Sequence, residues 1–202
     1  MKYFIDTASI SEIEKWSRFV EGATCNPSLL RKEGMDDYTF YINNVHLFKN
    51  IFIQVNSIND VEYLDNKQAD FQKLIFKVPL VKTNDYDGYK LLKVLTQNKL
   101  RTCSTIVYDI SQFDYACEVG SESSIVLYAK NDNSFIVNEC CHLKEKKGYE
   151  TKIVAASFRS AEHVFDCIKA GAEYGTVPPK IMKDLFSNEK AINDYKDFYE
   201  LI

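Results

Sequence analysis

Several features that would narrow the function at once are missing from this sequence. No apolar run approaches the ~18 residues that a membrane-spanning helix needs. No stretch of lysine and arginine is long enough to mark a nucleic-acid surface, and the net charge is -4. The N-terminal stretch MKYFIDTASI is too short and too acidic for a signal peptide and is typical of a first strand. We therefore expect a cytoplasmic protein that binds neither nucleic acid nor a membrane.

Metal-binding and redox motifs are also missing. The six cysteines lack C-x-x-C spacing and fall mostly in apolar segments, so reduced core thiols are expected. The run Cys140–His142 does not suggest a metal site, because adjacent ligands on a helix point in different directions. We expect no metal, since all three histidines fall in helical segments away from the strand ends: His46, His142 and His163.

No G-x-G-x-x-G motif follows the first apolar run, which argues against a doubly wound open sheet. The sequence has instead eight apolar runs rich in Val, Ile, Phe and Tyr, separated by amphipathic segments. They begin near residues 2, 22, 51, 74, 102, 123, 152 and 174. This alternation predicts an α/β fold, a single (β/α)8 TIM barrel spanning residues 1–202 as one domain. With 202 residues, of which 46% are hydrophobic, the chain is long enough to bury such a core.

Helix boundaries are marked in several of the amphipathic segments. Ser9 and Glu12 have the spacing of a capping box, and Ser160 and Gly171 bracket a segment as N-cap and C-cap. The last segment, about 189–202, predicts an additional C-terminal helix. Its apolar residues are expected to cover either the barrel or a neighbouring subunit: Ile192, Tyr195 and Phe198.

The run LIFKVPL, residues 74–80, contains a single charged residue, Lys77. Both faces of a strand in a parallel barrel are buried, and burial disfavours an unpaired ammonium group. A lysine there is expected to be neutral and nucleophilic, able to form a Schiff base with a carbonyl. The alternative is a strand-end lysine that reaches solvent, an alternative that Pro79 slightly supports.

Polar residues stand at the ends of most of the other predicted strands. A TIM barrel brings these carboxyl ends together at one face, where its active site lies. Each residue has an ordinary explanation when taken alone, as a helix cap, a turn residue or a solvated strand end. Together they predict a polar ring around the lysine: Asp6, Asn26, Gln54, Thr105, Tyr128, Lys130, Ser157 and Arg159.

Four blocks of the sequence resemble those of the transaldolase family, in particular its small members and the fructose-6-phosphate aldolase branch. FIDTASISEI is similar to the opening strand with its aspartate, and GATCNPSLL to the G-V-T-T-N-P-S-L signature. FKVPL resembles the V-K-I-P block that carries the Schiff-base lysine. VAASFRSAEHVFDCIKAGAEYGTVPPKI resembles the closing L-A-A-S-F-R block and the pattern after it. The blocks occur in order and cover nearly the whole chain.

The resemblance implies an enzyme that needs no cofactor and acts through Lys77, which would form the Schiff base with a ketose. Asp6 would transfer protons or orient donor hydroxyls, and Asn26 would hydrogen-bond the donor. The remaining residues of the ring would act in two groups. Gln54, Thr105 and Tyr128 would hold the water that relays protons, whereas Ser157 and Arg159 would bind an acceptor phosphate together with Lys130.

Two departures from the family pattern affect these expectations. Gln54 stands where strict transaldolases usually carry a glutamate, and an amide can orient a water but cannot exchange a proton. This favours aldol cleavage over strict transfer. In VLYAKND, Lys130 replaces an arginine and lacks its bidentate fork. A gapless alignment puts Leu127 at the family's aromatic position; an alignment with one residue missing puts Tyr128 there, and we prefer the latter.

The sequence therefore predicts a class I aldolase or transaldolase that acts on a ketose and an aldehyde, as sugars or sugar phosphates. One alternative is a strict transaldolase. Another, suggested by Cys25 and by the altered strand-six end, is a catalytically silent barrel that serves as a binding or scaffold protein. The resemblance also implies a homo-oligomer, because small members of the family tend to form rings.

Overall fold

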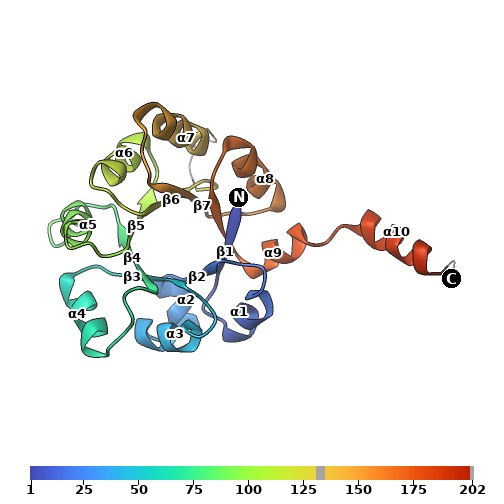
Figure 1. Ribbon diagram of the computed structural model, residues 1–202, viewed down its shortest axis with the longest axis horizontal. Helices are drawn as coiled ribbons and strands as arrows, with labels where there is room; N and C mark the ends of the chain where they lie inside the picture. The colour runs from blue at the N-terminus through green and yellow to red at the C-terminus, as the bar shows by residue number, and fades with distance from the viewer. Residues whose placement is uncertain (131–134, 201–202) are drawn as a thin grey trace.

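The computed structural model describes residues 1–130 and 135–200 of the chain, and its strands close into a parallel barrel in the order β1 to β8 (Figure 1). The eight strands pair with their neighbours in sequence, and β8 pairs with β1. The predicted (β/α)8 barrel is thus confirmed. The strands are β1 (Lys2–Asp6), β2 (Gly22–Thr24), β3 (Asn50–Gln54), β4 (Leu74–Pro79), β5 (Thr102–Val107), β6 (Ser123–Leu127), β7 (Lys152–Ala156) and β8 (Tyr174–Val177).

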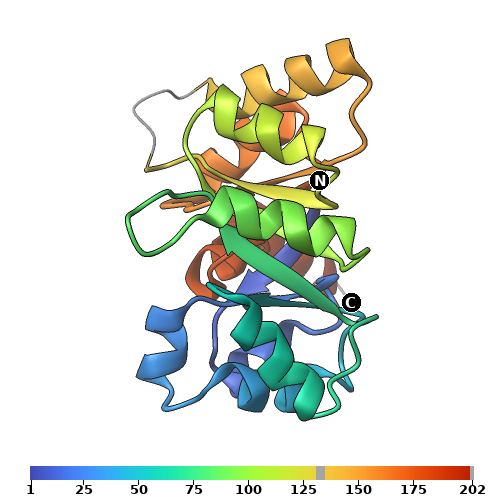
Figure 2. The same cartoon turned by 90° about the vertical axis from the view of Figure 1, so that its left-hand side faces the viewer.

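Helices surround the barrel, and α4, α5 and α6 lie side by side on the outside of the strands (Figures 1 and 2). The helices are α1 (Ile10–Trp16), α2 (Pro27–Lys32), α3 (Asp37–Asn44), α4 (Ile58–Asn66), α5 (Gly88–Gln97), α6 (Ile110–Glu118), α7 (Ile136–Lys147), α8 (Ala161–Ala170), α9 (Pro179–Leu185) and α10 (Glu189–Glu200). In the part of the chain that the structure describes, no helix is long and apolar enough to cross a membrane.

The capping signals are only partly realised. Gly171 ends α8 with a left-handed backbone (φ 98°), as expected for a glycine C-cap. Ser9 precedes α1, but in this described segment its side chain makes no capping hydrogen bond and pairs with the Ser11 hydroxyl instead. A capping box does form at α6, where the Asp109 carboxylate accepts from the Gln112 backbone N–H.

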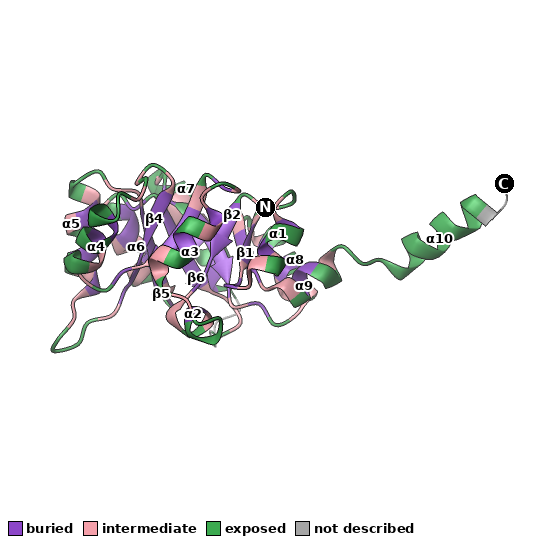
Figure 3. Cartoon of the chain, turned by 90° about the horizontal axis from the view of Figure 1, so that it is seen from below, coloured by how far each residue is buried: buried purple, intermediate pink, exposed green. Residues whose placement is uncertain are grey.

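Strand alternation divides the buried residues into two layers. Inside the barrel lies a small cluster made of Phe4, Phe52, Ile75, Cys103, Ile125, Val154 and Ala156, with Leu127 and Tyr174 packed against it. The larger core lies between the strands and the helices. Figure 3 shows buried residues along the strands and in parts of the surrounding helices. Because side chains alternate along a strand, a residue two positions after an inside residue also points inside.

That rule explains how the fold builds a functional end. Phe4, Phe52, Ile75 and Cys103 fill the middle of the barrel, and two positions later come Asp6, Gln54, Lys77 and Thr105. Each of these strands therefore presents one apolar side chain to the barrel interior and then one polar side chain at its carboxyl end. At the amino ends, Arg101 donates to both carboxylate oxygens of Glu122 and to Asn50, and these bonds tie strands together at that end.

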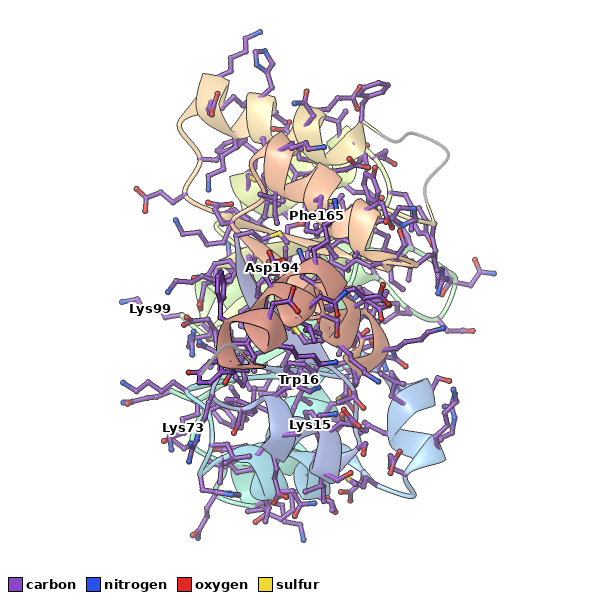
Figure 4. All side chains as sticks on the ribbon, turned by 90° about the vertical axis from the view of Figure 1, so that its right-hand side faces the viewer. Lys15, Trp16, Lys73, Lys99, Phe165 and Asp194 are labelled. Atoms are coloured by element: carbon purple, nitrogen blue, oxygen red, sulfur yellow. The ribbon has the colours of Figure 1, made fainter. Side chains whose placement is uncertain are left out.

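The C-terminal helix does not cover the barrel of its own chain. α10 extends away from the body of the molecule (Figures 1 and 3), and its residues 189–199 are all exposed. Figure 4 looks toward α10, with Asp194 on it, in front of the barrel. The sequence allowed two places for Ile192, Tyr195 and Phe198, the barrel of their own chain or a neighbouring subunit. The first of these predictions is wrong, because all three side chains are exposed. Residues 201–202 of the predicted helix lie outside the described residues.

Candidate active site

A cavity of about 440 Å³ opens at the carboxyl ends of the strands. It brings together eight of the nine residues predicted from the sequence; the ninth, Tyr128, is not among the lining residues. The predicted residues in its wall are Asp6, Asn26, Gln54, Lys77, Thr105, Lys130, Ser157 and Arg159. Thr24, Ser28, Leu127 and Thr176 are among the other residues in the wall.

Lys77 forms the floor of this cavity. Its side chain continues the inside-facing row that begins with Ile75, and only 5% of the residue is exposed. In register, it lies between Gln54 of β3 and Cys103 of β5. The Nζ atom donates a hydrogen bond to the Cys25 carbonyl oxygen. Among residues 1–130 and 135–200, no carboxylate forms a hydrogen bond or ion pair with this amine. A buried amine of this kind that reaches a cavity is a suitable nucleophile for a carbonyl carbon.

Asp6 lies in the same cavity. Burial raises the pKa of its carboxyl group above the ordinary value, although the Lys77 charge and a hydrogen bond from Thr24 oppose this rise. The Thr24 hydroxyl donates to Asp6 Oδ1 at 3.0 Å, and Thr24 also pairs with the hydroxyl of Thr176. A carboxyl group whose proton is held more tightly than usual can give that proton to a leaving hydroxyl.

Asn26 serves two purposes. Its backbone is extended and its side-chain oxygen accepts from Ser28 N at 3.0 Å and Leu29 N at 3.1 Å, which caps α2. Pro27 fits the first helical position, because its fixed φ suits the helix and it has no N–H to leave unbonded. The capping bonds use the amide oxygen, so the two N–H bonds of the Asn26 side chain are the ones available to a substrate hydroxyl.

Two wall residues have a left-handed backbone although neither is glycine. Ile106 has φ 59° at an irregularity in the β5–β6 pairing, and Ser157 has φ 68° just after β7. For a β-branched residue such as Ile106 this conformation is strained, and strain of this kind concentrates at functional sites. The Gln112 side chain of α6 holds the distorted segment, donating to Ile106 O at 3.2 Å and to Leu80 O at 2.8 Å.

The cavity mouth has an excess of positive charge. Lys130 and Arg159 are exposed at its rim, whereas Asp6 is the single carboxylate among the described residues of the wall. Hydroxyl groups of Ser28 and Ser157 accompany them. Guanidinium, ammonium and hydroxyl groups are the donors that phosphate oxygens bind best. The mouth is therefore suited to a phosphorylated ligand.

Tyr128 lies outside the cavity wall, in contrast to the position that the preferred alignment at strand six gives it. Its ring packs edge-on against His163 of α8 with centroids 5.4 Å apart, and its hydroxyl donates to Asp166 at 3.3 Å. The reason is strand alternation, because Leu127 is in phase with the inside residue Ile125 and Tyr128 is out of phase with it. Leu127 lines the cavity instead, as the gapless alignment had it.

Sequence reasoning missed the threonines of the wall. Thr24 and Thr176 are buried, and their hydroxyl groups join β2 to β8 beside Asp6. They occur in apolar runs as single small polar residues, a signal too common to mark a site. No group of three or more His, Cys, Asp or Glu side chains arranged to hold a metal ion occurs among residues 1–130 and 135–200.

Comparisons with known proteins agree with this geometry. The family described as "Transaldolase/Fructose-6-phosphate aldolase" matches residues 66–200, more than half of the chain. A "Probable transaldolase" of Carboxydothermus hydrogenoformans is 29% identical over 98% of this chain and 96% of its own length. Those of Methanococcus maripaludis and Alkaliphilus metalliredigens are 27% and 31% identical, over 98% and 91% of this chain and 95% and 89% of theirs.

Two solved structures share the fold. Orotidine 5'-monophosphate decarboxylase from Sulfolobus solfataricus superposes with a TM-score of 0.62 at 11% identity, covering 88% of this chain and 87% of its own. A 3-hexulose-6-phosphate synthase gives 0.60 at 15% identity, covering 88% and 90%. At these identities the likeness concerns the barrel alone. The sequence matches carry the conclusion that this chain belongs to the transaldolase/fructose-6-phosphate aldolase family.

Proposed function

We propose that this protein is a Schiff-base aldolase of the fructose-6-phosphate aldolase type, cleaving a dihydroxyacetone-type unit from a ketose or ketose phosphate. The observation that supports it best is Lys77, a nucleophilic side chain buried at the floor of a polar cavity, with Asp6 in the same wall. The inner apolar cluster fills the barrel one layer below these two residues.

The proposed reaction begins with attack of the Lys77 amine on the ketose carbonyl carbon, which gives a carbinolamine. Asp6, directly or through water, supplies the proton with which the hydroxyl group leaves as water, and an iminium ion remains. The iminium withdraws electrons from the neighbouring carbon. A base removes the proton of the hydroxyl one carbon further, the C–C bond breaks, an aldehyde leaves, and an enamine stays on Lys77.

The fate of the enamine separates an aldolase from a transaldolase. Protonation at carbon followed by hydrolysis releases the three-carbon ketone, whereas attack on a second aldehyde transfers the unit. Gln54 faces the cavity beside Lys77, and its amide can hold a water but cannot exchange a proton itself. We infer that water bound there protonates the enamine, which favours cleavage.

Strict transfer is the second candidate, and a specific observation favours it. Relatives that cover nearly the whole chain carry the name "Probable transaldolase". The two functions share every step up to the enamine. A panel of phosphorylated and unphosphorylated ketoses, each with and without an added aldehyde, decides between them, because a strict transferase forms product only when the second aldehyde is present.

Phosphate recognition is assigned to the cavity mouth. Arg159 and Ser157 offer charged and hydroxyl donors, and Lys130 adds a positive charge without the planar fork of arginine. Phosphorylated substrates should therefore bind more tightly than their unphosphorylated forms. The preference should weaken with salt, because Lys130 and Arg159 are exposed.

Covalent trapping tests the proposal. Borohydride added with a dihydroxyacetone-type donor should reduce the iminium and leave a stable mass adduct on the peptide that carries Lys77. The adduct should be lost in Lys77→Met and kept in Lys73→Met. Lys73 is a matched control, because it also donates to a backbone carbonyl, Val45 O at 2.9 Å, but does not line the cavity. Absence of any adduct across several donors would contradict Schiff-base chemistry and favour a silent barrel.

We further propose that the protein works as a homo-oligomer, with α10 packed on a second copy of the chain. Its aromatic side chains are exposed in the described structure, Tyr195 by 60% and Phe198 by 71%. Exposed aromatic side chains on one short helix are typical of a surface that a partner covers.

A further inference from the structure

A carboxyl group lies just behind the candidate active site. Asp37 is the first residue of α3, and Asp36 caps that helix by accepting from Thr39 N at 2.7 Å. The Asp37 side chain is half-buried. Its Oδ1 atom is fully buried, and no hydrogen-bond partner for it exists among the described residues. A buried polar atom without a partner is uncommon and requires an explanation.

Asp37 lines a second, smaller cavity of about 80 Å³, together with Gln54, Asp60 and Tyr63. Gln54 belongs to the walls of both cavities, so it separates Asp37 from the substrate side. The smaller cavity has both polar and apolar residues in its wall, and its volume exceeds the ~10–15 Å³ that a single water needs. Asp37 and Gln54 thus share a space large enough for a water molecule that would bridge the Asp37 carboxyl group and the Gln54 amide.

On its other side, Gln54 is the neighbour of Lys77. The two residues are in register on β3 and β4. Both continue inside-facing rows, and adjacent strands are ~4.7–4.9 Å apart. A side-chain amide has a negative oxygen end and a positive NH2 end. Which end faces Lys77 therefore decides whether Gln54 stabilises or opposes the positive charge of an iminium ion there.

We propose that Asp37 is a positioning residue, whose carboxyl group acts through the small cavity to set which end of the Gln54 amide faces Lys77. This inference rests on the proposed Schiff-base function. When Asp37 is ionised it accepts from the NH2 end, and the amide oxygen faces Lys77. When Asp37 is protonated it donates to the amide oxygen, and the NH2 end faces Lys77. The ionised state is the productive one, because the oxygen end attracts the iminium and accepts from the relay water.

The surroundings of Asp37 place this change within a useful pH range. Burial raises the pKa of its carboxyl group to about 6, and the negative charges of Asp60 and Asp36 add to the rise, while Lys77 opposes it. Tyr63 of α4 faces the same space and donates to Asp36 at 3.4 Å. Outside it, Lys67 lies over the rings of Tyr63 and Tyr38, 5.8 and 5.7 Å from their centroids.

The first test is the pH dependence of donor cleavage between pH 5 and 8. In the wild-type protein, kcat should rise with pH through an inflection near 6. In Asp37→Asn this inflection should vanish, and kcat at pH 7.5 should fall about tenfold, the effect of one hydrogen bond in the transition state. Asp36→Asn is the matched control. An asparagine still caps α3, so the inflection should remain, moved slightly to lower pH by the loss of one negative charge.

The second test asks whether Asp37 acts through Gln54. In a Gln54→Leu background, Asp37→Asn should have no further effect on kcat. A full additional loss in that background, or an unchanged inflection in Asp37→Asn, overturns the inference. Any separate inflection from Asp6 should be present in all of these variants, since none of them alters Asp6.

A third readout does not depend on turnover. The side-chain NH2 signals of Gln54 in a ¹⁵N–¹H spectrum, assigned by their loss in Gln54→Leu, should shift with a midpoint near pH 6 in the wild type and not in Asp37→Asn. A borohydride adduct with no pH-dependent Gln54 shift would overturn this inference and leave the proposed function intact. A shift without an adduct would support the positioning and overturn the proposed function.

Discussion

Lys77 occupies a position that the barrel would otherwise give to an apolar side chain. Ile75, two residues earlier on the same face, shows what the interior accepts, and only 5% of Lys77 is exposed. Among the described residues, its one hydrogen-bond acceptor is the Cys25 carbonyl oxygen, and no ion pair accompanies it. Holding an amine there lowers stability, a cost typical of residues kept for chemistry.

Replacing Lys77 by methionine should therefore stabilise the fold while it removes the reaction. Methionine has a similar length and no charge, so we expect a gain of about 1–3 kcal/mol in the free energy of unfolding. Urea unfolding followed by circular dichroism measures it, with Lys73→Met as the control. A clear loss of stability in Lys77→Met would mean that the amine has a structural role.

The two candidates for the water-holding hydroxyl can be separated by paired variants. Tyr128 bonds to Asp166 on the far side of β6, so Tyr128→Phe should change kcat/KM by less than about threefold. Thr105 lines the cavity, and Thr105→Val, which keeps the shape, should lower kcat by about tenfold or more. Steady-state cleavage assays decide, and the reverse order of effects would contradict this assignment.

At the scale of the residue, most of the side chains predicted from the sequence line one cavity, and alternation along the strands explains why. The polar residues that follow Phe4, Phe52, Ile75 and Cys103 by two positions all line the cavity. Tyr128 failed the same rule, and counting from Ile125 would have revealed it. The role inferred for Asp37 could not be predicted, because it depends on how α3 approaches β3 in space.

Among the elements, β5 and α6 are joined at the site by the Gln112 side chain. Besides its bonds to Leu80 and Ile106, the Gln112 side chain accepts from Tyr108 N at 2.7 Å and Asp109 N at 3.3 Å. One amide thus fixes the ends of β4 and β5 and the start of α6. It supports the strained segment that follows Thr105.

Gln112→Leu should weaken both the fold and the reaction. It leaves backbone groups of four residues without their side-chain partner, so we expect a loss of about 2–4 kcal/mol in stability. The activity that remains should show a lower kcat with a smaller change in KM, since Thr105 loses its support. Gln97→Leu, at the exposed end of α5, is the control and should be near neutral. Equal behaviour of the two variants would contradict a supporting role.

Helix ends agreed with the sequence prediction where the backbone conformation suits few residue types. Capping bonds differed from the prediction where a side chain has several possible hydrogen-bond partners. Gly171 ends α8 as expected, because glycine readily adopts a left-handed backbone. Ser9 was expected to cap α1, but its hydroxyl found another partner, Ser11. Serine hydroxyls have several acceptors within reach, so a capping pattern predicts the start of a helix better than it predicts the bond.

For the whole molecule, the exposed helix α10 is the feature that bears on assembly. The helix is a separate projection from the barrel (Figure 1), and the rings of Tyr195 and Tyr199 lie 4.5 Å apart on it. The amphipathic pattern of residues 189–202 correctly predicted a helix. The same pattern fits an apolar face that packs on the chain's own barrel and one that packs on another copy. Which of the two occurs depends on the direction in which the chain leaves α9.

Truncation after Ser187 should separate folding from assembly. Because residues 189–199 are exposed, the shortened chain should keep its circular dichroism spectrum and a cooperative unfolding transition. Light scattering after size exclusion should show an oligomer for the full chain and a smaller species for the truncated one.

A double charge substitution in α10 gives the sharper version of this test, since it leaves the chain length unchanged. Tyr195→Glu with Phe198→Glu places two carboxylates where the apolar face would be buried, and a buried unpaired charge costs several kcal/mol, enough to disrupt an interface. The control, Lys190→Glu with Lys196→Glu, alters residues outside the predicted apolar face and should leave the oligomer intact. A full-length monomer at all concentrations, or the same dissociation in both double variants, would contradict assembly through the aromatic face of α10. In either case, a partner other than a second copy of the chain would have to explain why these aromatic side chains are exposed.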